Sequence, residues 1–515
     1  MKFWTAITVT VLLGLLVAQL VVFLPFTIDD AYITFSHAKN LVDGHGLVFS
    51  RGTRVEATSS FLWAILVTPF EALLPQGALL GSKLLGVLSI CGTLWAGILL
   101  IRELIGTSSW TWPLSLLYSF TIIANSSFIT WSTYGMENGL MAFLLMMAAV
   151  LFVRESHLNK GILSAVLLLL VEMCRAEGFM FVTIFAALRL FEFATCRHQH
   201  ARARCIRWFI VLACSIGAYE AFGLAYYGHF LPNSATAKIP MLSWDTLVRG
   251  KEYLTEGPAA LFVLVFATLS LLLPYAAFSA SRGNSSFRSA VSLLWLCIVA
   301  QMAFSLVVGG DWMPNSRFLS HVFPLLLVLT ILTIWRIVDK AKLITSSSIG
   351  NISLSIAAIC AVVGYVANNV EYSKRSWKFQ NLLERAEEQG VRAMAEKLNE
   401  LDPSGSEVVA CSDIGRMGYY YRGRVMDWFG LADEEIAQQH LPLSEQAASI
   451  TLTRAPTFLV LYSNKPTLDA STMEFGEALH SRVFFNNPEL SKSYEQIYAL
   501  PFWQDRYQIL FRRKS

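Results

Sequence analysis

The sequence predicts a polytopic α-helical membrane protein, with about 11 transmembrane helices and a C-terminal extracytoplasmic α/β domain. Composition is the first reason: of 515 residues, 55% are hydrophobic and only 15% are charged, whereas soluble domains have about 25% charged residues. The second reason is a series of apolar runs that reach the roughly 20 residues needed to cross a bilayer. A net charge of +3 is too small for a nucleic-acid-binding protein, so no nucleic-acid partner is expected.

The first apolar segment, from Met1 to about Phe26, is longer than a signal-peptide core and is not followed by a convincing cleavage site. We expect it to be a retained span with a cytoplasmic N-terminus. The run Phe61–Leu74 is short and contains Pro69 and Glu71, which predicts a re-entrant or interfacial helix. The predicted spans are centred on Leu13, Ile90, Leu117, Met146, Leu168, Phe185, Ile216, Thr268, Cys297, Val328 and Cys360.

Basic turns orient these spans, because cytoplasmic turns are enriched in Lys and Arg. The most basic turn, Arg197–Arg207, is cytoplasmic only if Phe61–Leu74 is not a full span. This parity predicts a multi-pass protein of the inner (plasma) membrane. The first outer loop (27–78), the polar motifs below and the C-terminal segment are then on the periplasmic or extracytoplasmic side.

Two domains are expected, a transmembrane catalytic domain over 1–369 and an extracytoplasmic α/β domain over 370–515. The latter starts with a charged helical stretch, Ser373–Leu401. Four strand-like apolar runs follow: Glu407–Ala410, Thr457–Tyr462, Gln496–Leu500 and Tyr507–Phe511. The eight cysteines have no metal-type spacing, so neither a disulfide framework nor a zinc site is expected.

Two adjacent acids, Asp29 and Asp30, directly follow the first span. In a sugar transfer, a carboxylate can take the proton of the acceptor hydroxyl as its oxygen attacks the anomeric carbon. A phosphate leaving group needs only cations and hydrogen-bond donors. The alternative is that Asp29 and Asp30 cap the helix that follows. We take Asp29 and Asp30 as the catalytic candidates.

Arginines at the ends of apolar runs are candidates for binding the donor phosphate, because a charge there is expensive. Arg175 lies in Cys-Arg-Ala-Glu-Gly, and Arg317 follows Gly-Gly-Asp-Trp-Met-Pro. Arg175 could instead form a structural ion pair with Glu177 or Glu137, or order a catalytic carboxylate. His321, one turn after Arg317, could face the same site.

The remaining candidates are weaker. Lys238 could contact the donor phosphate, although lysines in outer loops are usually solvated charges. Glu56, Glu137, Asp311 and Trp312 could bind sugar or acceptor, because carbohydrate sites combine acids with aromatic faces; Trp312 also suits an interfacial aromatic belt. No Gly-rich phosphate loop and no Asp-x-Asp motif of a nucleotide-sugar site is visible. Because chemistry on the outer face cannot rely on cytosolic nucleotide sugars, a polyprenyl-phosphate sugar is the expected donor.

An ordered set of motifs resembles the GT-C superfamily of polyprenyl-dependent glycosyltransferases, and most of all the terminal β-(1→2) arabinofuranosyltransferase family. The likeness runs through nearly the whole chain. It is carried by Asp29–Ile33, Asn40–Phe49, Val55-Glu56, Ser60–Trp63, Gly135–Glu137, Arg175–Gly178, Leu231–Ser234, Gly310–Pro314, Arg317-Phe318, Asp413–Tyr420 and Asp427–Leu431.

The resemblance implies an inverting transferase in which Asp29 is the base and Asp30 supports donor or acceptor. No cofactor is required and no metal ligand is assigned, although some GT-C enzymes hold a divalent cation near the acidic pair. The chain departs from the family pattern twice: Ala176 replaces a common Pro, and Glu56-Ala57-Thr58 stands where Glu-Gly-Tyr is expected. The second departure concerns the sugar pocket. The sugar is therefore arabinofuranose or another pentose or hexose.

The expected acceptor is a cell-envelope glycan or glycolipid. A protein O-glycosyltransferase is an alternative, because the sequence does not expose the acceptor. An envelope-lipid transporter or flippase is an alternative of another class. Transporters often have repeated halves with ionisable residues near the midplane, whereas here the acids and arginines gather at one set of helix ends. A scaffold would leave these clusters unexplained.

Overall fold

A computed structural model describes most of the chain. The described residues are 2–106, 108–158, 160–238, 243–278, 285–313, 315–341, 369–438, 444–468, 473, 480–502 and 506–514. The predicted span centred on Cys360 lies outside them. The chain divides into two compact units: Met1–Pro25 with Lys83–Tyr219 and Leu242–Trp377, and Phe26–Ser82 with Glu220–Met241 and Lys378–Ser515. The predicted domains 1–369 and 370–515 stay a prediction.

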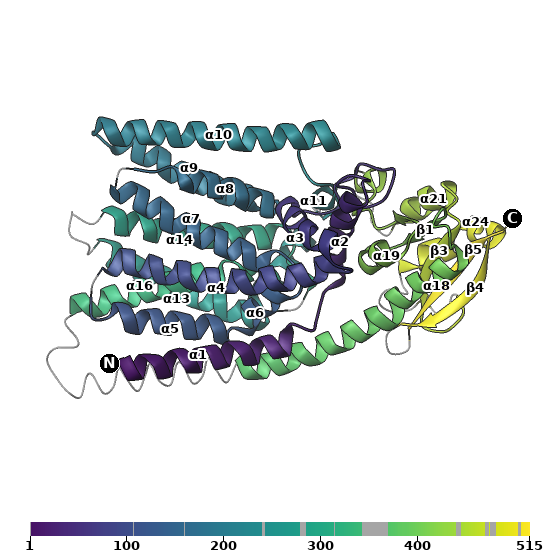
Figure 1. Ribbon diagram of the computed structural model, residues 1–515, viewed down its shortest axis with the longest axis horizontal. Coiled ribbons are helices and arrows are strands. Elements are labelled where there is room, and N and C mark those ends of the chain that lie inside the picture. Colours follow the sequence, from purple (N-terminus) through teal and green to yellow (C-terminus); the bar gives the residue numbers. More distant parts are fainter. Residues whose placement is uncertain are drawn as a thin grey trace. The chain divides into compact units, whose positions relative to one another are not determined.

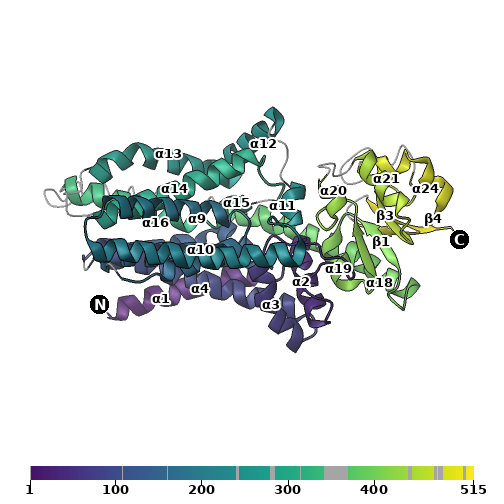
Figure 2. The same cartoon turned by 90° about the horizontal axis from the view of Figure 1, so that it is seen from above.

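The first unit is a bundle of helices, of which the long ones run side by side (Figures 1 and 2). Their apolar faces pack on one another, because a helix that is hydrophobic over most of its surface must be covered by other helices or by lipid. The helices are α1 (Lys2–Phe23), α4 (Gly77–Ile105), α5 (Thr111–Ala124), α6 (Ser126–Thr133), α7 (Asn138–Leu158), α8 (Leu163–Cys174), α9 (Gly178–Thr195), α10 (Gln199–Tyr227), α12 (Trp244–Thr255), α13 (Gly257–Phe278), α14 (Ser285–Val307), α15 (Arg317–Ser320) and α16 (Phe323–Ala341).

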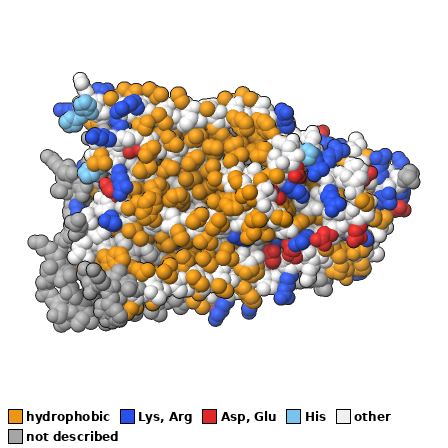
Figure 3. Space-filling view, viewed as in Figure 1, with side chains coloured by type: hydrophobic (Ala, Val, Ile, Leu, Met, Phe, Trp, Pro, Cys, Tyr) orange, Lys and Arg blue, Asp and Glu red, His pale blue; other side chains and the backbone are white. Residues whose placement is uncertain are grey.

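Several of these helices are long and apolar enough to cross a membrane. Within the described residues there are five, or up to seven if two bent pairs, α5 with α6 and α12 with α13, each count as one span. Figure 3 shows a broad hydrophobic surface over this unit. The chain is thus a multi-pass membrane protein. The predicted count of about 11 spans is not confirmed, because some apolar helices are short: α8, for example, has 12 residues.

The second unit contains a five-stranded sheet in the order β2-β1-β3-β5-β4. β1 (Val408–Cys411) is parallel to β2 (Arg424–Asp427) and β3 (Phe458–Ser463). β5 (Tyr507–Arg513) is antiparallel to β3 and to β4 (Tyr494–Pro501). The central strand β3 is buried along its whole length, which explains its unbroken apolar run.

Helices complete this unit. They are α2 (Asp29–Val42), α3 (Phe61–Leu73), α11 (Asn233–Lys238), the π-helical turn η1 (Glu387–Arg392), α18 (Ala393–Leu401), α19 (Ile414–Tyr420), α20 (Glu434–Gln438), α21 (Glu445–Thr453), α23 (Arg482–Phe485) and α24 (Pro488–Ser493). Residues 369–386 are helical and lead into η1. The helix predicted over Ser373–Leu401 is therefore present, with η1 inside it. α3 has 13 residues, which is short for a membrane span.

Candidate active site

One cluster of candidate residues in the first unit surrounds Arg175, in the extended connection between α8 and α9. Its Nη1 donates to Glu137 Oε1 and its Nε to Glu177 Oε1, both at 2.5 Å. Only 5% of Arg175 is exposed. The predicted structural ion pair is therefore present, and two carboxylates already neutralise this guanidinium.

A second ion pair lies in the loop between α14 and α15. The Arg317 guanidinium binds Asp311 through two hydrogen bonds, Nε to Oδ2 at 2.6 Å and Nη2 to Oδ1 at 3.2 Å. Ser316 before it has a left-handed backbone, with φ of 52°, which is strained for a residue with a side chain. Asn138, the first residue of α7, donates to the Arg317 carbonyl at 3.4 Å. Arg317 is thus tied to the start of α7.

His321 and Trp312, also predicted in this region, have opposite surroundings. His321 is fully buried, with Nε2 3.2 Å from Gln301 Oε1 and its ring against Phe181. It is part of the bundle interior rather than its surface. Trp312 is 69% exposed. Its ring is available to stack on a sugar.

Another ionic network occupies the other end of α7. Arg189 donates to Glu155 at 2.9 Å and to Glu192 at 2.7 Å, and Arg204 binds Glu192 as well. α7 has 21 residues, so its two ends are about 30 Å apart, close to the thickness of a hydrocarbon core. Within the first unit, the basic turn Arg197–Arg207 and the Arg175 cluster therefore lie at opposite ends of α7.

The acidic pair belongs to the second unit, where it begins α2. Asp29 Oδ2 accepts the backbone N–H of Gly415 at 2.9 Å, and Oδ1 accepts that of Arg416 at 2.8 Å. A Cβ on Gly415 would lie 2.0 Å from the Asp29 carbonyl oxygen. Glycine therefore permits this approach of α19 to α2. Asp29 is a partly buried carboxylate that caps α19, a partner far away in the sequence.

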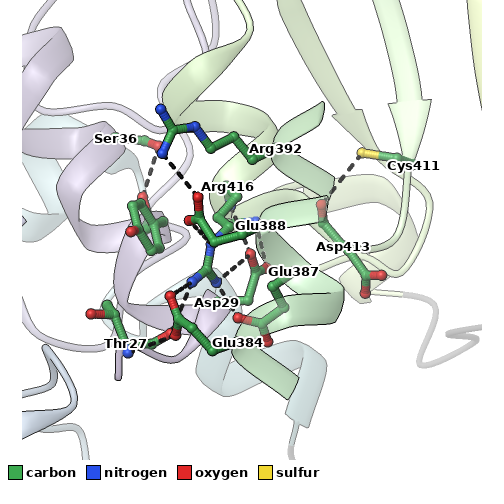
Figure 4. Close-up of polar contacts among 12 residues, drawn as sticks. Thr27, Asp29, Ser36, Glu384, Glu387, Glu388, Arg392, Cys411, Asp413 and Arg416 are labelled. Carbon is green, nitrogen blue, oxygen red and sulfur yellow. Dashed lines mark hydrogen bonds and ion pairs between the residues drawn. The ribbon is translucent and has the colours of Figure 1, made fainter. Parts of the chain in front are cut away.

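Arg416 is the centre of a larger ionic cluster (Figure 4). Its fully buried guanidinium pairs with Glu384 at 2.8 Å, with Glu388 at 3.2 Å and with Glu387, and lies 3.8 Å from Asp29. The three glutamates are spaced i, i+3 and i+4, which places them on one helical face. The last two start η1, and single π-helical turns are frequent at functional sites.

Burial determines the protonation of these acids. It raises the pKa of Asp29, against the lowering effects of Arg416 and of the two backbone N–H groups. Burial also raises the pKa of Glu387, with Arg416 opposing it. A carboxyl with a raised pKa is a stronger base. Asp29 therefore combines a fixed position with increased basicity.

The second unit also contains three other predicted residues, Asp30, Glu56 and Lys238. Asp30 is half-buried beside Asp29. Glu56 is 9% exposed, and burial, with a contribution from Glu220, raises its pKa to about 8. The Glu56 carbonyl accepts the N–H of Asn233 at 3.0 Å. Lys238 is the last residue of α11.

A divalent cation does not fit the residues around Asp29. Both carboxylate oxygens accept backbone N–H groups, and a guanidinium lies beside one of them. In the described part of the chain, no three His, Cys, Asp or Glu side chains are arranged to hold a metal ion. We therefore derive no step through a metal.

Sequence reasoning missed Arg416 and its three glutamates. Arg416 lies inside the motif Asp413–Tyr420, which contributed to the resemblance without a role for its arginine. The spacing of Glu384, Glu387 and Glu388 was a usable signal. Three acids on one helical face that otherwise packs in a core require a cation, because buried charges are paired.

Comparison with known proteins gives one partial family match and one curated relative. Residues 379–511 match a family described as a domain of unknown function (DUF8728). A terminal β-(1→2)-arabinofuranosyltransferase of Corynebacterium glutamicum is 26% identical over 360 residues, 61% of this chain and 48% of that protein. The chain therefore spans about half the length of this curated relative.

Solved structures share the fold at low identity. ArnT from Cupriavidus metallidurans has a TM-score of 0.55 at 12% identity, covering 99% of this chain and 98% of ArnT. The arabinofuranosyltransferase AftD from mycobacteria has 0.52 at 15%, covering 100% and 40%. The oligosaccharyltransferase AglB from Archaeoglobus fulgidus has 0.54 at 12%, covering 89% and 69%. The resemblance predicted from the sequence is thus confirmed: the chain is similar to an arabinofuranosyltransferase and has the fold of GT-C glycosyltransferases.

Proposed function

We propose that the chain is an inverting membrane glycosyltransferase. It moves a sugar, arabinofuranose or another pentose or hexose, from a polyprenyl phosphate to a cell-envelope glycan or glycolipid. The observation that carries the proposal is the acidic pair at the start of α2, with Asp29 fixed by α19. The curated relative is named as an arabinofuranosyltransferase. The AglB structure was solved with a dolichol-phosphate, which supports a polyprenyl-type donor.

In the proposed reaction, an acceptor hydroxyl oxygen attacks the anomeric carbon as the bond from that carbon to the phosphate oxygen breaks. The hydroxyl proton passes to a carboxylate, and polyprenyl phosphate leaves with the bonding electron pair. Asp29 is our candidate for the base, because burial raises its pKa. Each of its oxygens already accepts one N–H and keeps one further acceptor position.

The contacts of Asp29 also support a second division of roles. A carboxylate that accepts two backbone N–H groups and faces an arginine is suited to positioning. Asp30, next to it, would then take the proton. The two assignments differ in what each substitution does to stability, so the variants described below separate them.

In this proposal the arginines of the first unit position carboxylates rather than bind the donor directly. Arg175 and Arg317 are neutralised by Glu137 and Glu177 and by Asp311. They order these carboxylates, and exposed Trp312 has an aromatic face of the kind that stacks on sugars. We propose that this end of the bundle is extracytoplasmic, because the basic turn Arg197–Arg207 lies at the other end of α7.

The test is transfer by the purified full chain in nanodiscs, offered a panel of polyprenyl-phosphate sugars and an envelope-glycan extract. Wild type is compared with Asp29→Asn and Asp30→Asn, and the melting temperature (Tm) monitors folding. Loss of transfer in a variant that is still folded at the assay temperature, as its Tm shows, supports the acidic pair. If well-folded wild type transfers no sugar but moves a labelled envelope lipid between leaflets, the chain is a transporter instead.

A further inference from the structure

A small, open cavity of about 20 Å³ lies in the second unit, apart from the acidic pair. Its walls come from α2, the loop that follows α2, and the segment from α19 to β2. Three cationic residues line it: Lys39, Arg51 and Arg422. Ser50 adds a hydroxyl group, whereas the Tyr421 hydroxyl donates to Asp402 Oδ2 at 2.8 Å. The cavity is therefore rich in hydrogen-bond donors.

Lys39 is the most informative of the three cations. Its Nζ donates to the Tyr419 carbonyl oxygen at 2.6 Å and lies 5.2 Å from the Tyr419 ring centre. Within the described part of the chain it forms no ion pair. Burial lowers the pKa of Lys39. The negative charges of Asp43 and Glu71 oppose this effect, and the positive charges of Arg51 and Arg422 add to it. A half-buried ammonium without an ion pair among the described residues would gain further compensation from a bound anion.

The other two cations have little neutralisation. Arg51 lies 3.9 Å from Asp43, and both side chains are about two-fifths exposed, so this pair is weak. Arg422 is exposed, and its guanidinium has no ion pair among the described residues. By contrast, the buried Arg416 in the same unit has several carboxylate partners. The cations at the cavity therefore have charge available for an external anion.

The cavity and the acidic pair lie along the same pair of helices. Asp29, Tyr32, Ser36 and Lys39 follow one face of α2, at the spacing of successive helical turns. That face packs on α19: Tyr32 contacts the Tyr419 ring at 5.6 Å. Ten residues separate Asp29 from Lys39, which is about 15 Å along a helix. At this distance from Asp29, the cavity is too far from the reacting carbon to hold the leaving phosphate.

We propose that this cavity, lined by Lys39, Arg51 and Arg422, binds an anionic substituent of the acceptor glycan, a phosphate or carboxylate group, at a distance from the reacting hydroxyl. The role of the bound molecule as an acceptor rests on the proposed function, whereas anion binding itself does not depend on transfer. Lysine and arginine both bind phosphate, and arginine also matches the planar carboxylate. The subsite would select charged acceptors over neutral ones.

The experiment is equilibrium binding by the full chain in nanodiscs of neutral lipid. Glucose 6-phosphate and glucuronate are the anionic probes, and glucose is the neutral one. We expect saturable binding of at least one anion and none of glucose. Lys39→Gln and Arg422→Gln should each raise the Kd about ten-fold or more, as expected for losing a charged hydrogen-bond donor.

Arg424→Gln is the matched control. Arg424 is also exposed, and Arg424→Gln removes the same charge. Arg424 does not line the cavity, although its neighbour Val425 does. Its Kd should equal that of wild type. The proposal is overturned if wild type binds neither anion, if Lys39→Gln and Arg422→Gln bind like wild type, or if Arg424→Gln weakens binding equally. It is also overturned if polyprenyl phosphate, added to the nanodiscs, is the only one of these ligands whose binding requires Lys39 and Arg422. Binding without transfer would refute the proposed function and leave the anion site intact.

Discussion

Asp29 and Arg416, 387 positions apart, meet in the second unit. The Arg416 backbone N–H donates to Asp29 Oδ1 at 2.8 Å, and the guanidinium Nη1 lies 3.8 Å from the same oxygen. The residue after the first span is thus fixed by the segment between β1 and β2. The position and charge of Asp29 depend on Arg416, which makes Arg416 a positioning residue in the proposed reaction.

Asp29→Asn and Asp30→Asn should differ in stability. An amide at position 29 places an NH₂ group against a backbone N–H and loses one hydrogen bond. This costs about 1–3 kcal/mol and lowers the Tm. Asp30→Asn keeps the size and polarity of the side chain and should lower the Tm less than Asp29→Asn does. Substitution of the residue that acts as the base should lower the transfer rate about 10²–10⁴-fold.

Rate and Tm are measured together on each variant. A large rate loss in Asp30→Asn at unchanged Tm would assign the base to Asp30 and a positioning role to Asp29. Loss confined to Asp29→Asn would retain Asp29 as the base. Full turnover by both variants would show that neither acid takes the proton.

Arg416→Gln should destabilise the protein strongly. It leaves Asp29 and three glutamates without their cation, and removing one partner of a buried ion pair costs about 3–5 kcal/mol. Burial already raises the pKa values of Asp29 and Glu387, and without Arg416 these two values rise further in the folded state. The stability that the two acids contribute is then present at low pH and is lost as the pH rises. The drop in Tm should therefore be larger at pH 8 than at pH 5.

Arg392→Gln is the control for that prediction. Arg392 pairs with Glu388 and Glu396, but a third of its side chain is exposed, so its loss costs about 1 kcal/mol or less. An equal effect of the two substitutions, or a pH-independent effect of Arg416→Gln, would show that the cluster does not store this electrostatic energy.

Local pattern in the sequence was enough for much of the fold. Apolar runs identified the helical bundle, and alternating or apolar short runs identified β1, β3, β4 and β5. β2 was missed because Arg424–Asp427 has only four residues with a charge at each end. The number of spans depends on where helices break, and an extended residue such as Arg175 ends α8 inside an apolar region.

The candidate site was predictable only where its partners are close in sequence. Arg175 and Glu177 are two positions apart, so their pairing was an explicit alternative. Asp29 was singled out from its position after a span, but its partner Arg416 belongs to a distant segment. Long-range contacts follow from how α2 and α19 pack, and no local pattern encodes that packing.

The pH dependence of stability should show a contribution from Asp427. It is fully buried, and burial raises its pKa to about 7. Its unfolded value is near 3.8, so the folded state favours the neutral acid. The stability it contributes is complete below about pH 4 and is lost as the pH rises through 7. The Tm of Asp427→Asn minus that of wild type should therefore increase between pH 5 and pH 8; a constant difference would contradict this assignment.

Glu137→Gln tests the Arg175 cluster. The change keeps the shape of the side chain but leaves the buried guanidinium with one carboxylate, Glu177. A loss of a few kcal/mol is expected, because breaking a buried ion pair leaves an uncompensated charge. Unfolding in detergent measures it. Glu434→Gln, at a pair with His229 that is about half exposed, should change the Tm little. A Tm of Glu137→Gln equal to wild type would show that Glu137 is free for substrate.

Gly415→Ala tests whether α19 must approach α2 this closely. A Cβ at this position would lie 2.0 Å from the Asp29 carbonyl oxygen and 2.4 Å from Oδ2, so α19 must move and both N–H contacts to Asp29 are lost. We expect a lower Tm and a loss of transfer comparable to that of Asp29→Asn. Gly217→Ala is the matched control, because nothing lies within 4 Å of its added Cβ. It sits inside α10, where alanine favours the helix by about 1 kcal/mol over glycine. Normal transfer by Gly415→Ala would mean that α19 does not position the acid, and the base would then have to be argued from Asp30 alone.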